Sequence, residues 1–277
     1  MVARSEKQLN IWLDVNEKGK SMKFHQDHLD RLKCCISKEE SYKWLSNMSP
    51  KNFADKVLID GILPDSERDI CIARFDEKKV DRCDVRKFVR RSDVNTLEKV
   101  LFVMAWGGMH IHNAKSALKS YSTCWEMIAN KMLESNICKD EAYKQFHNLV
   151  KSKKLKNMGA AYFTKLIYFL ESNHNGYIMD QWTARSMNLL RKCPDNQIHL
   201  TSNGRSHNGR YRKFRVSNNN DCAVYSEFCK DLEHLAEVLC KTPEETEILL
   251  FSNGGRLPDL GCWRRYVLEQ TSFSKPK

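Results

Sequence analysis

Residues 154–190 read KLKNMGAAYFTKLIYFLESNHNGYIMDQWTARSMNLL and are the most informative part of the chain. Apolar residues recur at helical spacing over 160–170 and again over 181–190, which predicts two helices. A tight turn, Asn157-Met158-Gly159, precedes the first helix, and Asp180 opens the second. The stretch therefore predicts a turn that presents a helix N-terminus, followed by a carboxylate at the start of the next helix.

The helical pattern continues on both sides of this stretch. Further helices are predicted over residues 96–106, 114–133, 139–150, 226–240 and 243–251. The last of these has Thr242 as its N-cap and Glu245 three residues later, which is the spacing of a capping box. With 11 Gly and 6 Pro in 277 residues, the chain is predicted to be mostly α.

Two regions depart from this pattern. Residues 1–95 are charge-rich and are predicted to form short helices and loops, as an N-terminal extension of a helical domain over 96–277. Residues 193–221 are rich in Asn, Ser, Gly and Arg, and are predicted to form a long, exposed basic loop. Loops of this length in compact domains are usually functional or disordered.

Composition narrows the class of protein. The 46 Lys and Arg against 35 Asp and Glu give a net charge of +11, which favours a polyanionic partner such as DNA. No apolar run approaches the roughly 20 residues needed to cross a bilayer, and the charged N-terminus is unlike a secretory signal. We therefore expect a cytoplasmic protein with no membrane partner, and the sequence indicates no obligate protein partner.

The eleven cysteines include no CxxC pair, so the sequence gives little support to structural zinc or to any other metal site. Without a secretion signal, a disulfide framework is not expected either. The cysteines are interpreted as buried free thiols that behave as small apolar residues.

The hairpin and the aspartate together resemble the helix-hairpin-helix DNA glycosylase superfamily, in particular its bacterial branch with an 8-oxoguanine DNA glycosylase-like fold. The family hairpin reads roughly Leu-Pro-Gly-Val-Gly, and residues 155–159 read Leu-Lys-Asn-Met-Gly. The family aspartate follows the hairpin glycine by about twenty residues, and Asp180 lies 21 residues beyond Gly159. The resemblance implies a helix-hairpin-helix glycosylase fold with its hairpin over 154–165, and an enzyme that flips a base and cleaves its N-glycosidic bond.

Roles for these residues follow from the resemblance and from simple electrostatics. Lys154, Lys156, Asn157 and Gly159 are expected to bind DNA phosphate together with the helix amides, and a monovalent cation at the hairpin is compatible with this arrangement. Asp180 is expected to stabilise an oxocarbenium-like sugar and to orient water. The alternative is that Asp180 is an ordinary N-cap.

One departure from the family bears on mechanism. Family members that form a Schiff base carry lysine two residues after the hairpin glycine, where this chain has Ala161. We therefore expect a monofunctional enzyme that uses water. Lys165 lies one helical turn further on, on the same face, and is either a nucleophile, a pocket or phosphate contact, or a solvated or ion-paired lysine.

An iron–sulfur cluster is not expected. Cys222 and Cys229 match the first spacing of the family's cluster motif, but Cys240 lies too far along the chain. No other cofactor is predicted.

Further candidate contacts flank the hairpin. The turn after the helix over 96–106 suits a flipped base, although Trp106 is equally compatible with the core. The candidate base-pocket residues are Trp106, His110, His112, Asn113, Ala161, Gln181 and Trp182. The basic loop suits phosphate contacts, although a solvated insert remains the alternative, and its candidates are Arg205, Arg210, Arg212, Lys213 and Arg215.

Three functions stay open. The first is a DNA glycosylase, in repair or in defence against phage DNA with bulky modified bases such as glucosylated hydroxymethylcytosine. The second is a non-enzymatic DNA-binding module that uses only the hairpin, and the third is a helical protein-interaction domain. Oxidised guanine is the substrate that the resemblance implies.

Overall fold

A computed structural model describes residues 23–36, 44–59, 62–171, 173, 175–192, 197–205, 212–251 and 260–272. The chain is mostly helical, as predicted. Its elements are α2 (Gln26–Ile36), α3 (Pro50–Val57), α4 (Asp65–Ala73), α5 (Arg82–Val89), α6 (Thr96–Trp106), α7 (Ile111–Leu118), the π-helical turn η1 (Tyr121–Trp125), α8 (Glu126–Leu133), α9 (Lys139–Lys151), α10 (Ala160–Leu170), α11 (Gln181–Leu190), β1 (Leu200–Arg205), β2 (Arg212–Val216), α12 (Cys222–Leu239), α13 (Pro243–Phe251) and α14 (Cys262–Ser272).

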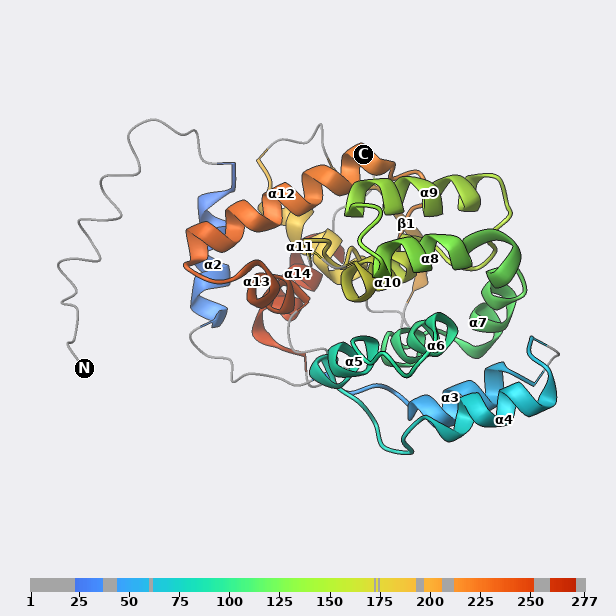
Figure 1. Ribbon diagram of the computed structural model, residues 1–277. Helices are drawn as coiled ribbons and strands as arrows, with labels where there is room; N and C mark the ends of the chain where they lie inside the picture. Colours follow the sequence, from blue (N-terminus) through green and yellow to red (C-terminus); the bar gives the residue numbers. More distant parts are fainter. Residues whose placement is uncertain are drawn as a thin grey trace.

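The helices gather around two central ones. Helix α10 contacts α5, α6, α8 and α9, and lies at the middle of Figure 1. Helix α11 contacts α2, α12, α13 and α14. The segment 171–180 connects these two groups, so Asp180 lies where the chain passes from one group to the other.

Apolar packing around α10 joins the helices on either side of the hairpin turn. The predicted apolar stripe of α10 is confirmed, since Phe163, Leu166, Ile167 and Leu170 are all buried. The Phe163 ring stacks on Phe146 of α9 with ring centroids 5.5 Å apart. The two helices on either side of the turn are therefore held together by aromatic packing.

The apolar core includes residues from both sides of position 95. The rings of Phe88 in α5 and Phe102 in α6 stack with centroids 4.0 Å apart, and α3 also contacts α6. The predicted division of the chain at residue 95 stays a prediction, and the structure shows apolar packing on both sides of it.

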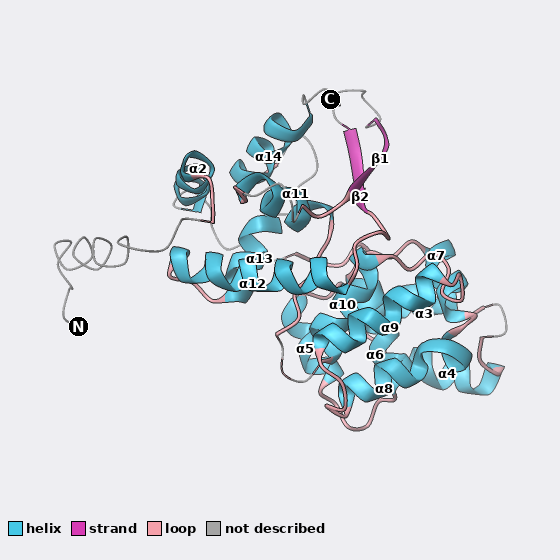
Figure 2. Ribbon diagram, turned by 90° about the horizontal axis from the view of Figure 1, so that it is seen from above, coloured by secondary structure: helices cyan, strands magenta, loops and turns pink. Residues whose placement is uncertain are grey.

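Two sequence-based predictions of secondary structure are wrong. The single helix over 114–133 is interrupted by η1, where Trp125 is fully buried and its indole N–H donates to the Ala117 carbonyl at 3.1 Å. The predicted loop over 193–221 contains an antiparallel ribbon in which Leu200 pairs with Val216 and Ser202 with Phe214. Alternation of polar and apolar residues along 212–216 was the local signal for a strand, and the polar composition of the region obscured it. Figure 2 shows the two magenta strands extending outward from the helices.

The interpretation of the cysteines as free thiols is wrong for one pair. Cys35 of α2 and Cys262 of α14 form a disulfide, with Cα atoms 5.5 Å apart. The ring of His28 also contacts the Tyr266 hydroxyl at 2.8 Å, so α2 and α14 are joined at two places. Of the other described cysteines, Cys71 and Cys229 are buried as expected, whereas Cys83, Cys138 and Cys240 are exposed, so the interpretation as buried thiols is wrong for these three.

None of the described helices combines the length and apolarity that crossing a bilayer requires.

Candidate active site and nucleic-acid interface

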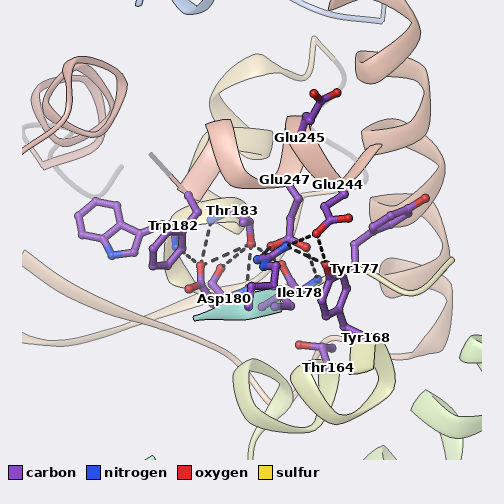
Figure 3. Close-up of polar contacts among 12 residues, drawn as sticks. Thr164, Tyr168, Tyr177, Ile178, Asp180, Trp182, Thr183, Glu244, Glu245 and Glu247 are labelled. Carbon is purple, nitrogen blue, oxygen red and sulfur yellow. Dashed lines mark hydrogen bonds and ion pairs between the residues drawn. The ribbon is translucent and has the colours of Figure 1, made fainter. Parts of the chain in front are cut away.

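Asp180 is held in place by the start of α11. Its Oδ1 accepts hydrogen bonds from the amides of Trp182 (2.7 Å) and Thr183 (3.1 Å), and the Asp180 amide donates to the Thr183 hydroxyl (3.0 Å), as Figure 3 shows. From the α10 side, the Thr164 hydroxyl accepts from the Met179 amide at 3.2 Å. The carboxylate is 8% exposed and borders two cavities.

The turn before α10 has the geometry that its sequence predicts. Asn157 adopts a left-handed conformation, with φ of 60°. It stands at the first glycine of the family pattern, and asparagine tolerates this conformation better than most residues. Leu155 and Met158 are buried and anchor the turn, while Lys154 and Lys156 remain exposed.

Gly159 is the N-cap of α10 and has an extended conformation. A Cβ at this position would lie 2.9 Å from Oδ1 of Asn218. The glycine therefore permits a close approach by the turn that follows β2, and it contributes no capping side chain. Among the described residues, the amides of Ala160 and Ala161 have no acceptor, so these two amides can bind a phosphate.

The larger cavity, of about 750 Å³, lies between this turn, the first half of α10 and β2. Of its charged lining side chains, Lys153, Lys156, Lys165 and Arg215 are basic and Asp180 is acidic. Its other lining residues are Gly107, Asn113, Val150, Leu155, Asn157, Met158, Gly159, Ala160, Ala161, Tyr162, Gln181, Phe214, Val216 and Asn218. The surface thus combines open helix amides with positive charge.

Lys165 borders both cavities. Its ammonium donates to the Gly107 carbonyl at 2.9 Å and lies 5.4 Å from the centre of the Tyr162 ring. Burial lowers the pKa of Lys165, with Asp180 opposing that shift. Because helical side chains tilt toward the N-terminus, the amine extends back toward Ala161, and the structure places it beside Asp180 rather than on the outer surface.

The smaller cavity, of about 190 Å³, lies on the other side of Lys165 and Asp180. Trp44 and Phe251 contribute aromatic walls, with ring centroids 5.2 Å apart. Trp106 is 5% exposed, and its indole N–H has no acceptor among the described residues. A buried donor without a partner is costly, so this wall favours a ligand that supplies an acceptor.

A network of ion pairs and hydrogen bonds forms the back of the smaller cavity. Arg82 donates to Glu247 at 2.8 Å and to the Tyr168 hydroxyl at 3.1 Å. Glu247 also accepts from the Ile178 amide at 3.3 Å, and Tyr168 donates to Glu244 at 2.7 Å (Figure 3). Burial raises the pKa of Glu247, although Arg82 opposes that shift.

Sequence reasoning missed most of this cavity. Of its aromatic and charged walls, only Trp106, Lys165 and Asp180 were candidates, whereas Trp44, Arg82, Glu247 and Phe251 were not. Glu247 carried a usable signal, because it lies three residues before Leu250 on the buried face of α13. A carboxylate on a buried helix face needs a partner, and here Arg82 supplies it.

The structure brings only some of the candidate base-pocket residues together. Asn113, Ala161 and Gln181 line the larger cavity, and Trp106 lines the smaller one. The candidates His110, His112 and Trp182 border neither cavity among the described residues. His110 caps α7 by accepting from the His112 amide at 3.4 Å, and both histidines are exposed.

Only some of the DNA-binding candidates line the larger cavity. Lys156, Asn157, Gly159 and Arg215 line the larger cavity, and Lys154 and Lys213 are exposed. Arg205 is the last residue of β1 and Arg212 the first residue of β2, while Arg210 lies outside the described residues. The cation at the hairpin and the absence of an iron–sulfur cluster stay predictions. Within the described residues, no three His, Cys, Asp or Glu side chains are placed to hold a metal ion.

Comparison with protein families identifies the chain. Residues 43–251, about three quarters of the sequence, match the family described as "Putative 8-oxoguanine DNA glycosylase OGG-like protein". The chain belongs to this family, which implies a DNA glycosylase that binds DNA and excises a base. Searches of curated proteins and of solved structures each found no significant match.

Proposed function

We propose that this member of the OGG-like family is a monofunctional DNA glycosylase in which Asp180 lies between a duplex-binding surface and a base pocket. The observation that carries the proposal is that two cavities of different character meet at Asp180 and Lys165. The larger one is basic and borders open helix amides, which suits a sugar–phosphate backbone. The smaller one is walled by aromatic rings, which suits a base rotated out of the stack.

The proposed chemistry uses the oxygen of Asp180 that the protein leaves available. Both capping amides donate to Oδ1, and no hydrogen bond to Oδ2 occurs among the described residues. Cleavage of the N-glycosidic bond leaves positive charge on the sugar, which a carboxylate stabilises. Oδ2 would also orient the water that adds to the sugar carbon, so that the products are the free base and an abasic site.

Lys165 would contact the leaving base instead of attacking the sugar. Alanine at position 161 removes the nucleophile of the bifunctional family members, and the Lys165 ammonium is engaged by the Gly107 carbonyl. A cationic donor at this place stabilises negative charge that develops on the departing base. We therefore propose hydrolysis without strand cleavage.

The walls of the smaller cavity support a guanine-derived base as the first candidate. Guanine presents a carbonyl acceptor next to N–H donors on its pairing edge. Trp106 and Lys165 supply donors for the carbonyl, and the Glu247 carboxylate supplies an acceptor for the N–H groups. Trp44 and Phe251, which contact each other edge to face, would together form an apolar wall beside the base.

A bulky modified base, removed in defence against phage DNA, is the second candidate. It is favoured by one observation, namely that the smaller cavity adjoins one of about 750 Å³. A sugar substituent on a cytosine ring could extend into that space while the ring occupies the smaller cavity.

The test is a substrate panel. Purified protein is incubated with duplexes that contain 8-oxoguanine, uracil, an alkylated base or glucosylated hydroxymethylcytosine. Free base is measured by mass spectrometry, and abasic sites are measured by alkali cleavage. We expect release of one class of base, without strand cleavage before alkali. DNA binding without release from any duplex would instead favour the non-enzymatic binding module.

Borohydride trapping tests the proposed role of Lys165. A glycosylase that uses water forms no imine, so we expect no covalent protein–DNA complex in the presence of borohydride. A trapped complex that forms with the wild type and disappears in Lys165→Ala would overturn the monofunctional assignment and make Lys165 the nucleophile.

A further inference from the structure

The β1–β2 ribbon has two chemically different faces. Along β2, Lys213 and Arg215 are exposed, whereas Phe214 is half-buried and Val216 is buried. Because alternate residues of a strand point to opposite faces, the two basic side chains share the outer face. Thr201 pairs with Arg215 and is also exposed, so this face carries positive charge and a hydroxyl group.

Strand β2 borders the same cavity as the hairpin turn. Arg215 borders the same cavity as Lys153, Lys156 and the amides at Gly159. Asn218, directly after β2, lies against Gly159. A polyanion seated on the hairpin would therefore also meet the ribbon.

Hydrogen bonds fix the base of the ribbon to α9, the helix that leads into the hairpin. The carbonyl of Asn218 contacts the His147 ring through Nε2 at 3.0 Å, and Lys151 donates to the Asn219 side chain at 3.0 Å. His147 and Lys151 belong to α9. The ribbon and the hairpin thus share one support and present their charges in a fixed relation.

An aromatic–guanidinium stack supports the inner face of the ribbon. The Arg185 guanidinium lies 4.8 Å from the centre of the Phe214 ring and 5.1 Å from that of Trp182. Arg264 lies 4.2 Å from the Trp182 ring and 4.6 Å from the Phe251 ring. This stack runs from the ribbon, past the helix that Asp180 caps, to a wall of the smaller cavity.

We propose that the β1–β2 ribbon is a second DNA-contacting element, which holds phosphates of the duplex through Lys213 and Arg215 beside the hairpin. The inference rests on the proposed function for its ligand, duplex DNA. A two-stranded ribbon is narrow enough to lie along a groove, and its basic face contacts the backbone without reading sequence. The duplex is then held at two places, and the rigid support of both keeps the flipped nucleotide aligned with Asp180.

The test measures binding to a duplex that contains a tetrahydrofuran abasic-site analogue, which needs no knowledge of the excised base. The double variant Lys213→Ser/Arg215→Ser is compared with the wild type between about 50 and 200 mM salt. Each lost phosphate contact lowers the slope of log K against log salt by about 0.9. We expect the slope to fall by about 1.8, so the affinity defect should be about tenfold larger at low salt than at high salt.

The matched control removes the same charge elsewhere. Lys230 lies in α12 and Lys241 follows the C-cap of that helix, and neither borders a cavity. Lys230→Ser/Lys241→Ser should therefore bind like the wild type. A ribbon variant with the wild-type slope, or a control variant that loses as much slope, overturns the ribbon proposal. A wild type without salt-dependent duplex binding would instead refute the proposed function itself.

Discussion

Replacing Asp180 by asparagine should separate the structural task of this side chain from its chemical one. Asp180 accepts the Trp182 and Thr183 amides through one oxygen, and asparagine offers an equivalent oxygen at an N-cap. Asn and Asp cap helices about equally well, whereas Ala at an N-cap costs about 1 kcal/mol. The free energy of unfolding of Asp180→Asn should therefore be within about 0.5 kcal/mol of the wild-type value. Asp180→Ala should be measurably less stable.

The chemical effect should be much larger. A carboxylate about 4 Å from a developing positive charge contributes about 4 kcal/mol at an effective dielectric constant of about 20. Since about 1.4 kcal/mol corresponds to a tenfold change in rate, loss of the charge should slow base release about a thousandfold. Binding of the tetrahydrofuran duplex should be retained, because a neutral amide repels phosphate less than a carboxylate does.

The assay pairs single-turnover base release with chemical denaturation, and Asp221 supplies the control. Asp221 caps α12 by accepting from the Val224 amide at 3.1 Å, and it borders neither cavity. Asp221→Asn and Asp221→Ala should follow the same stability pattern with unchanged base release. If Asp180→Asn releases base within tenfold of the wild-type rate, Asp180 is only a cap and the mechanism is wrong.

Three further perturbations test particular features. Because Asn157 has φ of 60°, Asn157→Gly should keep the stability of the hairpin, and Asn157→Val should cost about 1–2 kcal/mol and weaken duplex binding; equal stability of the two variants would refute this. Burial lowers the pKa of Lys165 in the folded protein. Protonation of Lys165 therefore lowers the free energy of unfolding at every pH below the pKa of free lysine, about 10.4. In thermal unfolding, the wild type should therefore gain stability relative to Lys165→Met as the pH rises toward about 10, and a pH-independent difference would contradict the shift. Cys35→Ser opens a disulfide to Cys262 that spans 227 residues and should lower the free energy of unfolding by about 2–4 kcal/mol, whereas a similar loss in the neighbouring control Cys34→Ser would count against the disulfide.

Features that depend on neighbouring residues were predictable from the sequence. Helices α6, α10 and α11 have the predicted bounds, because their apolar spacing and caps lie within one or two turns. The Thr242–Glu245 capping box is present, with the Glu245 amide donating to the Thr242 hydroxyl at 3.2 Å. The position of Asp180 at a helix start follows from the same local rule.

The β1–β2 ribbon shows where local reasoning gave the wrong element. Strands gain their hydrogen bonds from a partner strand, so a polar segment can be a loop or a ribbon until that partner is known. Phe214 belongs to the face of the ribbon that packs against the helices, where its ring contacts the Arg185 guanidinium. No residue near Phe214 in the sequence predicts this contact.

The sequence by itself determined the helical class, the hairpin turn and the place of Asp180, because each depends on hydrogen bonds and apolar spacing over a few residues. Tertiary structure alone decided what surrounds Asp180. The smaller cavity takes its walls from Trp44, Arg82, Trp106 and Glu247, which lie far apart in the chain. A buried carboxylate such as Glu247 is stable only where packing brings a distant partner to it, so its role becomes visible only when the helices are assembled.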